Sequence, residues 1–591
     1  MELKISILYG SETGTAQDTA EQIWKSSKRY GFKCSVSSMD EYSIENLVAE
    51  RLVIFVVATT GHGEPPHNMT KFWRFLLRKN LPTNSLENVK YAVLGLGDSS
   101  YEKYNFAAKK LNRRLAQLGG TEILPIGLAD DQHDLGIDAT VGPWVQNLWR
   151  IISSTFGVTL DHTSSSDDAM IERFNVSVDN ENEHNLSNGH IDDIYRVELT
   201  SNKDLMLGRL TENIRTTTED HFQDVRLMKF HANNVNYAPG DVLYVRPKNS
   251  RQQVDNFFAL LKENNIKLCR SSVIRITEKE IRVPMVLRKP LTLGEIVEQY
   301  WDLSFKPRRS TMQVLASVSD NELEKEKLYE FTLPTGQEEL FSYVNRPRRT
   351  IIEVLRDFPH TTKNLNERIL FEIMSPIKPR AFSIASSTEY TKNEVHLLVA
   401  VVRYKTKLLA PRIGLCSNWL ANLKPRDEIV FSIQKGTFKF NCTKPMILIG
   451  PGTGVAAFRS LLLERTARGD DLKDTLLFFG CRNKSKDYHC RNDFELMSKN
   501  NNLQVFCAFS RDQKDKIYVQ HVIRRERQLC WEYLQRDGSI YLSGSSKNMP
   551  KCVRDEFVEL AKDLGRLDEA GAETFISKLE KEGRYQTETW G

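Results

Sequence analysis

Four stretches of the sequence combine glycine, hydroxyl and basic residues in ways that suit phosphate-bearing ligands. The first, LYGSETGTAQD at residues 8–18, follows a short apolar run and precedes a helical pattern. Gly10 and Gly14 are followed by Thr15 and Ala16, so the loop lacks the lysine that nucleotide hydrolases use for their β- and γ-phosphates. Backbone N–H groups, hydroxyls and a helix N-terminus can hold a single phosphate without it. The pattern therefore predicts a cradle for one phosphate.

The second stretch is IGPGTGVAAFRS, residues 449–460, where an apolar run ends and a helical pattern begins. Gly450, Gly452 and Gly454 would let the backbone approach a pyrophosphate, whose charge a helix N-terminus favours. Glycine-rich turns also serve simply to pack a helix on a sheet, and this motif alone leaves that alternative open.

The third stretch, FSRDQKDKIYVQ at residues 509–520, gathers Ser510, Arg511 and Lys516 beside Tyr518. A hydroxyl, a guanidinium and an ammonium next to an adenine-sized aromatic ring suit a ribose 2′-phosphate. Sites for plain NAD usually present an acidic residue there. A solvated run of charges is the alternative, which the preceding glycine motif disfavours.

The fourth stretch, PRIGLCSNWLANL at 411–423, is a glycine-hydroxyl turn that enters a helical pattern, and PRAFSIASS at 379–387 precedes it. Arg380 can pair with a phosphate through two parallel hydrogen bonds, and Phe382 offers a flat face. Each half is a weak signal alone, because a strand that ends in serine can be only a strand.

The elements around these motifs alternate strand and helix over residues 1–150. Helices are predicted between the strands, for example at Ala16–Tyr30 and Met69–Arg78, and such alternation indicates a doubly wound parallel sheet of flavodoxin-like size. Loops ATTGHGEPPHN (58–68) and GLGDSSYEKYN (95–105) leave strand ends, where a parallel sheet binds a flat ring that carries a phosphate. The strands are predicted at Lys4–Tyr9, Lys33–Ser37, Leu52–Ala58, Tyr91–Leu96 and Glu122–Ile126.

The rest of the chain divides into three parts. Residues 151–193 are polar, acidic and nearly free of aromatics, which predicts a flexible linker. Residues 194–440 predict an antiparallel β-barrel, interrupted at about 250–370 by a helical insert, and residues 441–591 predict a second doubly wound sheet. The barrel strands are predicted at Tyr195–Leu199, Val242–Val245, Arg380–Ile384, Val395–Tyr404 and Glu428–Ile433.

Composition excludes several classes of protein. The 591 residues are too many for one core, and no apolar run approaches the length of a membrane span. The N-terminus MELKISILYG shows no signal-peptide pattern, so we expect a cytoplasmic protein. Nine cysteines without a CxxC pair disfavour disulfides and a metal site, and a net charge of +5 without aromatic-interleaved basic runs disfavours nucleic-acid binding.

Taken together, the motifs resemble those of the diflavin reductases, the family of cytochrome P450 reductase, over essentially the whole chain. ETGTAQDTA, LGLGDSSY, NRPRRT, RAFSIAS, GLCSNWL and YQTETW are most similar to the soluble NADPH-dependent diflavin oxidoreductases of cytosolic iron–sulfur assembly. The resemblance implies that FMN, FAD and NADPH bind, and that electrons pass from NADPH to FAD, to FMN and on to a one-electron acceptor protein. It further implies a monomer without a membrane anchor, whose acceptor in a transient complex is the iron–sulfur adaptor anamorsin.

Roles for individual residues follow from the resemblance alone. Those implied for FMN are Ser11, Glu12, Thr13, Gly14, Thr15, Ala16, Thr59, Thr60, Gly61, His62, Leu96, Gly97, Asp98, Ser99, Ser100, Tyr101, Glu102, Lys103, Tyr104, Asn105 and Asp131. Those implied for FAD are Arg348, Arg380, Ala381, Phe382, Ser383, Gly414, Leu415, Cys416 and Ser417. Those implied for NADPH are Thr453, Ser510, Arg511, Lys516, Ile517, Tyr518, Val519 and Gln520. Trp590 would stack on the FAD ring until nicotinamide displaces it, and the Ser383 hydroxyl would lie near flavin N5; these two are the implied catalytic residues.

The chain departs from cytochrome P450 reductase at three positions. Thr60 stands where that relative covers one face of FMN with an aromatic residue, and Ser543 and Cys552 stand where it has a cysteine and an aspartate. We therefore expect a looser hold on FMN and a slower hydride step, which geometry alone can still support. The alternatives are a soluble reductase that serves a haem protein or methionine synthase, and a scaffold that has lost catalysis. A scaffold would not need a 2′-phosphate site.

Overall fold

The computed structural model describes residues 3–60, 63–101, 103–157, 170–179, 194–199 and 204–590. The chain forms two compact units. One unit contains Met1–Ile194, Asn249–Lys378 and Thr406–Leu408, and the other contains Tyr195–Lys248, Pro379–Lys405 and Leu409–Gly591. The insert therefore packs with the N-terminal domain, although in sequence it interrupts the barrel.

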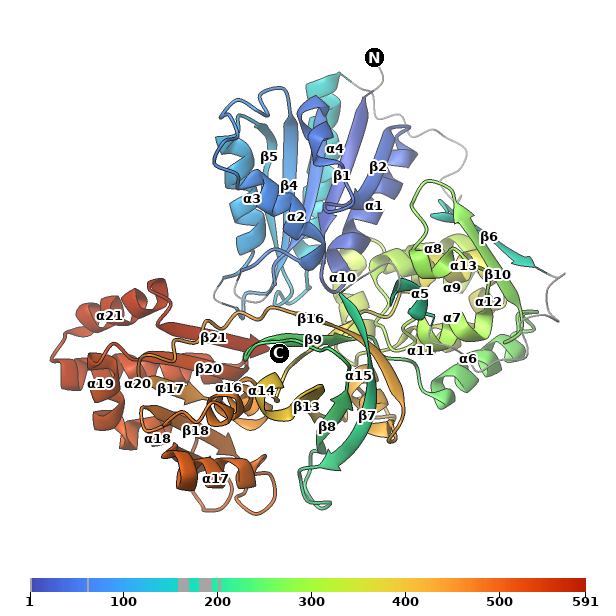
Figure 1. Ribbon diagram of the computed structural model, residues 1–591. Coiled ribbons are helices and arrows are strands. Elements are labelled where there is room, and N and C mark those ends of the chain that lie inside the picture. Colours follow the sequence, from blue (N-terminus) through green and yellow to red (C-terminus); the bar gives the residue numbers. More distant parts are fainter. Residues whose placement is uncertain are drawn as a thin grey trace. The chain divides into compact units, whose positions relative to one another are not determined.

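The N-terminal domain is a five-stranded parallel sheet in the order β2-β1-β3-β4-β5 (Figure 1). All five predicted strands are confirmed, with small extensions at their ends. The order reverses direction between β1 and β3, and ligands of such sheets bind beyond the carboxyl ends of strands at that point. The strands are β1 (Lys4–Gly10), β2 (Lys33–Ser38), β3 (Leu52–Ala58), β4 (Lys90–Gly97) and β5 (Thr121–Asp130).

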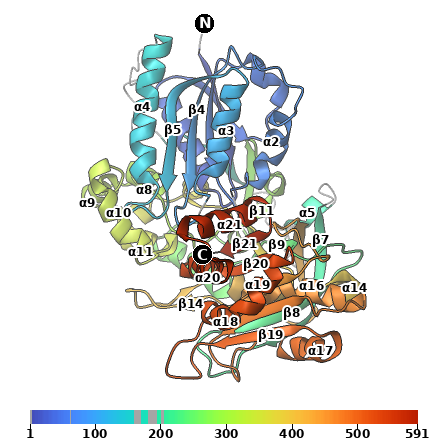
Figure 2. The same ribbon diagram turned by 90° about the vertical axis from the view of Figure 1, so that its left-hand side faces the viewer.

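Helices cover both faces of this sheet. Strand β3 has the apolar sequence LVIFVVA, and six of its seven residues are buried. This is expected for a central strand of a parallel sheet, which is covered on both faces. One face packs against α1 (Thr15–Arg29) and α4 (Asp138–Phe156), and the other packs against α2 (Thr70–Leu76) and α3 (Phe106–Gln117). Figure 2 shows α4 and α3 on opposite sides of the sheet.

The segment predicted to be only a linker contains regular structure at two places, which corrects that prediction. Helix α4 continues to Phe156, and β6 (Phe174–Asp179) pairs antiparallel with β10 (Val273–Glu278) of the insert. Phe174 and Val176 alternate with exposed residues and are buried, so a short period-two pattern was present within the polar segment. Residues 158–169 and 180–193 lie outside the described part of the chain.

The insert is mainly helical, as predicted, and its helices begin at capping residues. Ser250, Thr292 and Thr350 each open a helix, and the residue three places on completes a capping box. Strand β11 (Leu291–Thr292) extends the sheet of β6 and β10. The helices are α6 (Arg251–Glu263), α7 (Leu293–Gln299), α8 (Arg309–Val318), α9 (Glu322–Glu330), α10 (Gln337–Leu340), α11 (Ile351–Asp357), α12 (Pro359–Thr362) and α13 (Glu367–Ile373).

The second unit begins with a six-stranded antiparallel sheet in the order β12-β9-β16-β7-β8-β13, which forms the predicted barrel. Two of its strands, β7 and β8, were not predicted. The only buried residues of β7 are Gly208 and Leu210, so its alternation of buried and exposed residues is obscured. The strands are β7 (Leu205–Arg215), β8 (Val225–His231), β9 (Val242–Val245), β12 (Arg380–Ser383), β13 (Glu394–Ala400) and β16 (Glu428–Gln434).

Two predicted barrel strands need correction. The first, at Tyr195–Leu199, is wrong, because Arg196–Leu199 forms the helical turn α5. Tyr195 is buried, but the next two residues, Arg196 and Val197, are both exposed, whereas a strand would send neighbours to opposite faces. The second, Val395–Tyr404, is too long: β13 ends at Ala400, and Arg403–Tyr404 (β14) pairs separately with Arg412–Ile413 (β15).

The C-terminal domain is a second parallel sheet, in the order β19-β18-β17-β20-β21. The predicted second doubly wound sheet is confirmed. Its C-terminal segment forms an edge strand, in which Tyr585 is buried and Trp590 is 39% exposed. The strands are β17 (Met446–Ile449), β18 (Thr475–Cys481), β19 (Gln504–Phe509), β20 (Ser539–Ser545) and β21 (Tyr585–Trp590). The helices are α14 (Thr388–Thr391) and α15 (Leu415–Asn422) in the barrel domain, then α16 (Val455–Ala467), α17 (Arg491–Asn501), α18 (Val519–Arg525), α19 (Arg527–Gln535), α20 (Asn548–Gly565) and α21 (Glu569–Lys581).

Within the described ranges, no helix is both long and apolar enough to cross a membrane. The same residues contain no group of three histidine, cysteine or acidic side chains placed to hold a metal ion.

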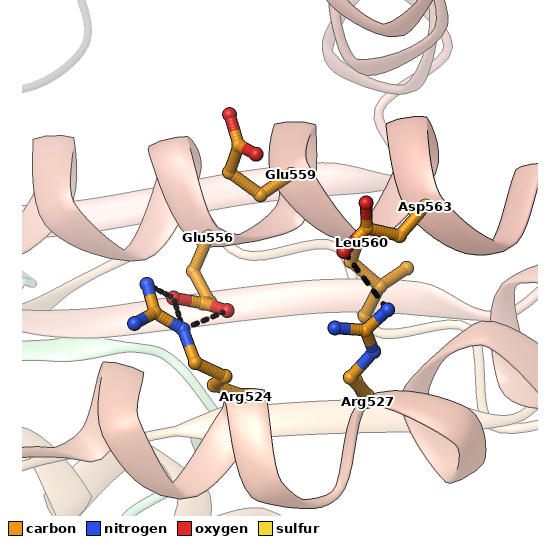
Figure 3. A pocket seen from close by; sticks show the side chains of 6 residues that line it. All are labelled: Arg524, Arg527, Glu556, Glu559, Leu560 and Asp563. Carbon is orange, nitrogen blue, oxygen red and sulfur yellow. Dashed lines mark hydrogen bonds and ion pairs between the residues drawn. The ribbon is translucent and has the colours of Figure 1, made fainter. Parts of the chain in front are cut away.

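Charged side chains from α18, α19 and α20 pair across a surface hollow of about 200 Å³ (Figure 3). Arg524 donates to both carboxylate oxygens of Glu556, from Nε at 3.0 Å and from Nη2 at 2.7 Å, and Arg527 pairs with Asp563 at 2.8 Å. Glu556 is only 5% exposed, and a buried carboxylate without a partner is costly. Because these charged groups pair with one another, we interpret the hollow as part of the packing between the helices and not as a binding site.

Arg524→Met should speed hydrogen exchange in α18 and α20 about 5–30-fold, because the buried carboxylate loses a partner worth on the order of 1–2 kcal/mol. Mass spectrometry of peptides from the two helices measures this. Arg525→Met is the control, since its pair with Glu526 lies at the surface and should change exchange by less than about twofold. Equal acceleration in both variants would contradict the assignment.

Candidate cofactor sites

The loop between β1 and α1 has the backbone conformation of an anion cradle. Gly14 has φ +92°, in the left-handed region, and its N–H donates to Ser11 Oγ at 3.0 Å. Asn68 Oδ1 accepts from the Ser11 N–H at 2.8 Å and fixes the start of the loop. Gly14 is the N-cap of α1 and, among the described residues, no side chain caps the helix. Its first N–H groups therefore face the loop as donors for a phosphate.

The loop after β3 folds back on itself. Thr60 donates its N–H to the Glu64 carbonyl at 3.0 Å, and its hydroxyl donates to the same oxygen at 3.2 Å. Thr59 Oγ1 accepts from the Ala107 N–H at 3.3 Å, which ties this loop to α3. Gly61 and His62, both predicted for FMN, lie outside the described residues.

Asn105 organises the loop after β4. It adopts φ 55° as the N-cap of α3, is fully buried, and donates from Nδ2 to the Ala129 carbonyl at 3.0 Å. A Cβ on Gly97 would lie 2.9 Å from the Asn105 side chain, so only glycine fits there. Tyr104 donates its hydroxyl to the Leu128 carbonyl at 2.7 Å. The loops after β4 and β5 are therefore joined under the predicted ring site.

Two carboxylates cross-link the same loops. Asp130 accepts from the N–H groups of Ser99 at 2.8 Å and Gln132 at 3.0 Å. Although burial opposes it, hydrogen bonding from these two residues lowers the pKa of the Asp130 carboxyl. Asp98 accepts from the Ser100 hydroxyl at 2.6 Å, and the Asp131 N–H donates to the Gly97 carbonyl at 2.9 Å. Hydrogen bonds to the two carboxylates therefore hold the geometry of these loops.

Not every residue predicted for FMN can offer its side chain. Ala16, Leu96 and Asn105 are buried in the domain, so their contribution is confined to backbone and to shape. The described residues predicted for FMN whose side chains are exposed are Thr13, Ser99, Ser100, Lys103 and Asp131. Glu102 lies outside the described residues.

The residues predicted for FAD fall into both units. Arg380, Ala381, Phe382 and Ser383 form β12, and Gly414 is the N-cap of α15, again without a side-chain cap among the described residues. A Cβ on Gly414 would meet Val402 Cβ at 2.8 Å. Arg348 belongs instead to the unit that contains the flavodoxin-like sheet, where it adopts φ 54°.

The two halves of the predicted FAD motif lie near each other in the second unit. Burial raises the pKa of the Cys416 thiol to about 12, while the Arg380 guanidinium acts in the opposite direction. Arg380 therefore lies within electrostatic range of the start of α15. Ser417 Oγ accepts from the Val402 N–H at 3.0 Å, so its hydroxyl also fixes the turn.

Ser383 has a partner that the sequence did not reveal. Its hydroxyl donates to Glu588 Oε1 at 3.1 Å, and the hydroxyl of Thr437 donates to Glu588 Oε2 at 3.2 Å. Glu588 lies in β21, two residues before Trp590, so one carboxylate joins a barrel strand to the C-terminal sheet. The only signal in the sequence was an acidic residue in YQTETW.

The glycine turn after β17 packs against β20. A Cβ on Gly454 would lie 2.1 Å from the Ser543 carbonyl oxygen, whereas at Gly452, with φ +58°, it would meet nothing within 4 Å. Gly454 is the N-cap of α16 and Thr453 lies in the turn before it; no described side chain caps this helix. Ser543 is fully buried, and within the described chain its Oγ has no hydrogen-bond partner.

The predicted 2′-phosphate loop is held by the neighbouring strand. The N–H groups of Ser510 and Arg511 donate to the carbonyls of Cys481 at 2.9 Å and Arg482 at 2.8 Å. Arg511, Lys516 and Tyr518 are exposed, and Tyr518 is the N-cap of α18. Further residues of this motif are Ile517 and Gln520, both half-buried, and Val519, which is 3% exposed and packs in the core, so its side chain is unavailable to a ligand.

Comparisons with known proteins support the same three-part division. Three family models match in chain order: Flavodoxin at residues 7–144, FAD binding domain at 204–419 and Oxidoreductase NAD-binding domain at 448–555. NADPH-dependent diflavin oxidoreductase 1 of Xenopus laevis is 44% identical, with 99% of both chains covered. The proteins of that name from Mus musculus and Schizosaccharomyces pombe are 41% and 35% identical at the same coverage.

A flavodoxin-like domain, an FAD-binding barrel and an NADP-binding sheet in one chain define a diflavin reductase. Its cofactors are FMN, FAD and NADPH, and the predicted fold class and enzyme class are confirmed. The chain belongs to the NADPH-dependent diflavin oxidoreductase 1 family.

Gly454→Ala should weaken NADP⁺ binding about tenfold or more, because the new methyl group forces the β17–α16 turn away from β20. Gly469→Ala, beyond the other end of α16, is the matched control; at φ +79° it costs about 1 kcal/mol of backbone strain, but its Cβ meets no neighbour and it lies outside the predicted loop. Isothermal titration with NADP⁺ measures both. Similar losses in the two variants would show that the close approach to Ser543 does not matter.

Proposed function

We propose that this protein reduces the iron–sulfur adaptor anamorsin, with electrons from NADPH, in cytosolic iron–sulfur protein assembly. The observation that supports the reductase chemistry best is the hydrogen bond from Ser383 to Glu588, which places a predicted catalytic hydroxyl where the FAD-binding barrel adjoins the NADP-binding sheet. When bound, the flavins supply the chemistry that takes two electrons together and gives them up singly.

Residues of the chain orient the reacting groups. Glu588 accepts from both Ser383 and Thr437, so the Ser383 hydroxyl is held in one direction. We assign Ser383 to the flavin side of the hydride step and Glu588 to positioning Ser383. Trp590, at the exposed end of the same strand, is suited to cover the ring until nicotinamide replaces it.

Arg511 is proposed to select NADPH over NADH. Its neighbour Asp512 is acidic and would repel a 2′-phosphate, but its carboxylate accepts from Asn483 Nδ2 and from the Lys484 N–H, each at 2.8 Å. These two hydrogen bonds keep the Asp512 carboxylate bound to the adjacent loop, which contains Asn483 and Lys484. The exposed Arg511 guanidinium therefore remains available to a ribose phosphate although its neighbour is acidic.

Purified protein should contain one FMN and one FAD, and anaerobic NADPH should reduce both while NADH acts poorly. Arg511→Glu should raise the KM for NADPH about 100-fold and leave NADH use unchanged or improved, since it replaces a charge-assisted contact with repulsion. Lys514→Glu, which makes the same charge change in the same loop, is the control. Absence of flavin would refute the reductase, and equal loss with both nucleotides would refute the role of Arg511.

The choice of anamorsin rests on motif resemblance to the soluble NADPH-dependent branch of the family. A haem protein or methionine synthase is the alternative acceptor, and a non-catalytic scaffold is the alternative from another class. The retained Ser510 and Arg511 loop supports catalysis, because a scaffold has no use for a 2′-phosphate site.

Stopped-flow mixing of NADPH-reduced protein with oxidised anamorsin, a haem protein or methionine synthase distinguishes these possibilities. We expect saturable reduction of the anamorsin cluster, at least tenfold faster than reduction of the other acceptors at equal concentration. Faster reduction of another acceptor would refute this choice while leaving the reductase intact. Failure to oxidise NADPH with any acceptor would favour the scaffold.

A further inference from the structure

The FMN loop has no lysine of its own, although a phosphate monoester carries a charge of about −1.5 to −2 at neutral pH. In the same compact unit, the insert places an arginine directly at this loop. Arg308 lies with Nη1 at 3.5 Å from the Gly14 carbonyl oxygen and Nη2 at 3.3 Å from Thr15 Oγ1. It also pairs with Asp18 in the first turn of α1, at 3.3 Å.

A second cation from the insert touches the same loop. Lys378 Nζ donates to Gln17 Oε1 at 3.3 Å. Its Cε would lie 2.8 Å from a Cβ built on Gly14, so the end of the lysine side chain rests against the bend of the loop. Arg308 and Lys378 therefore lie at the helix start whose N–H groups are the predicted donors to phosphate.

The surroundings of these cations are rich in positive charge. Burial lowers the pKa of the Lys306 ammonium, and Arg348 and Arg308 lower it further, while Asp131 opposes them. Asp18, Asp131 and Asp138 lie among the same cations. A phosphate bound at the loop would add a further negative charge beside Arg308.

Attachment of the insert to α1 explains only one contact of Arg308, its pair with Asp18. The docking face of α1 consists of Asp18, Glu21, Lys25 and Lys28, spaced three or four residues apart. Glu21 pairs with Arg173 at 3.1 Å, Lys25 pairs with Glu372 at 2.6 Å, and Lys28 pairs with Glu280. These pairs lie farther along the helix, whereas Arg308 also contacts the loop itself, at the Gly14 carbonyl oxygen and at Thr15 Oγ1.

We propose that Arg308 and Lys378 of the insert complete the FMN phosphate site. The loop Ser11–Thr15 supplies the neutral donors, and the insert supplies the positive charge that a nucleotide-hydrolase loop obtains from its own lysine. The inference rests on FMN occupying this loop. By thermodynamic linkage, FMN strengthens the contact between insert and flavodoxin-like domain by the same factor by which that contact strengthens FMN binding.

The test compares FMN with riboflavin, which has the same ring and ribityl chain without the phosphate. Full-length protein stripped of FMN is titrated with each, and flavin fluorescence gives the two dissociation constants. Arg308→Met should raise the constant for FMN about tenfold or more and that for riboflavin less than about twofold, since only the phosphate loses a charged partner. Lys378→Met should act in the same direction.

Two controls make the result specific. Lys25→Met removes a docking pair away from the loop, and Arg346→Met removes an exposed insert cation that pairs with Glu338. Neither should change the ratio of FMN to riboflavin affinity, and bound FMN should show an altered ³¹P resonance only in the Arg308 and Lys378 variants. An unchanged ratio in both of those variants would overturn the proposal. Wild-type protein that binds neither flavin would overturn the reductase assignment instead.

Discussion

The predicted cofactor sites depend on hydrogen-bond donors for phosphate oxygens. These donors are N–H groups that lie where a strand or turn ends and a helix begins. Helix α18, after the predicted 2′-phosphate loop, begins at Tyr518 with a capping box. The helices at the other three predicted cofactor loops, α1, α15 and α16, each have a glycine N-cap: Gly14, Gly414 and Gly454. No described side chain caps any of them. By contrast, the insert helices α6, α7 and α11 start at serine or threonine with full capping boxes. A side-chain cap would occupy the N–H groups that an anion needs.

Leaving a helix without a side-chain cap costs about 1 kcal/mol, so packing elsewhere must hold these helices. Helix α16 buries ten of its thirteen residues, including Arg459, which donates to Asp493 at 2.7 Å. Gly454 then permits a close approach to Ser543 that any side chain would prevent. Glycine therefore serves two needs at once: it frees the donors, and it lets the helix start pack directly against the neighbouring strand.

Some features of the fold and of the sites could be predicted from the sequence, and others could not. The glycine loops and the buried parallel strands were predictable because their residue types are dictated locally, by backbone conformation and by burial on both faces. Helix α5, strand β6 and strand β21 were not, because each is defined by a partner distant in the sequence. The same holds within the sites. Motifs identified Ser383 and Arg511, but the pairing of Glu588 with Ser383 and the burial of Val519 depend on tertiary packing.

The electrostatics of α1 connect the first cofactor site to the rest of the chain. The ion pairs of the docking face of α1 differ in exposure: the Arg308–Asp18 pair is partly exposed and weakens with salt, whereas the pairs of Glu21 and Lys25 are largely buried. The insert is covalently continuous with β9 and β12, two strands of the FAD-binding barrel. A phosphate that binds both the α1 loop and Arg308 would therefore link FMN occupancy to the contact between the flavodoxin-like domain and the insert. The insert in turn is connected to the barrel through the chain.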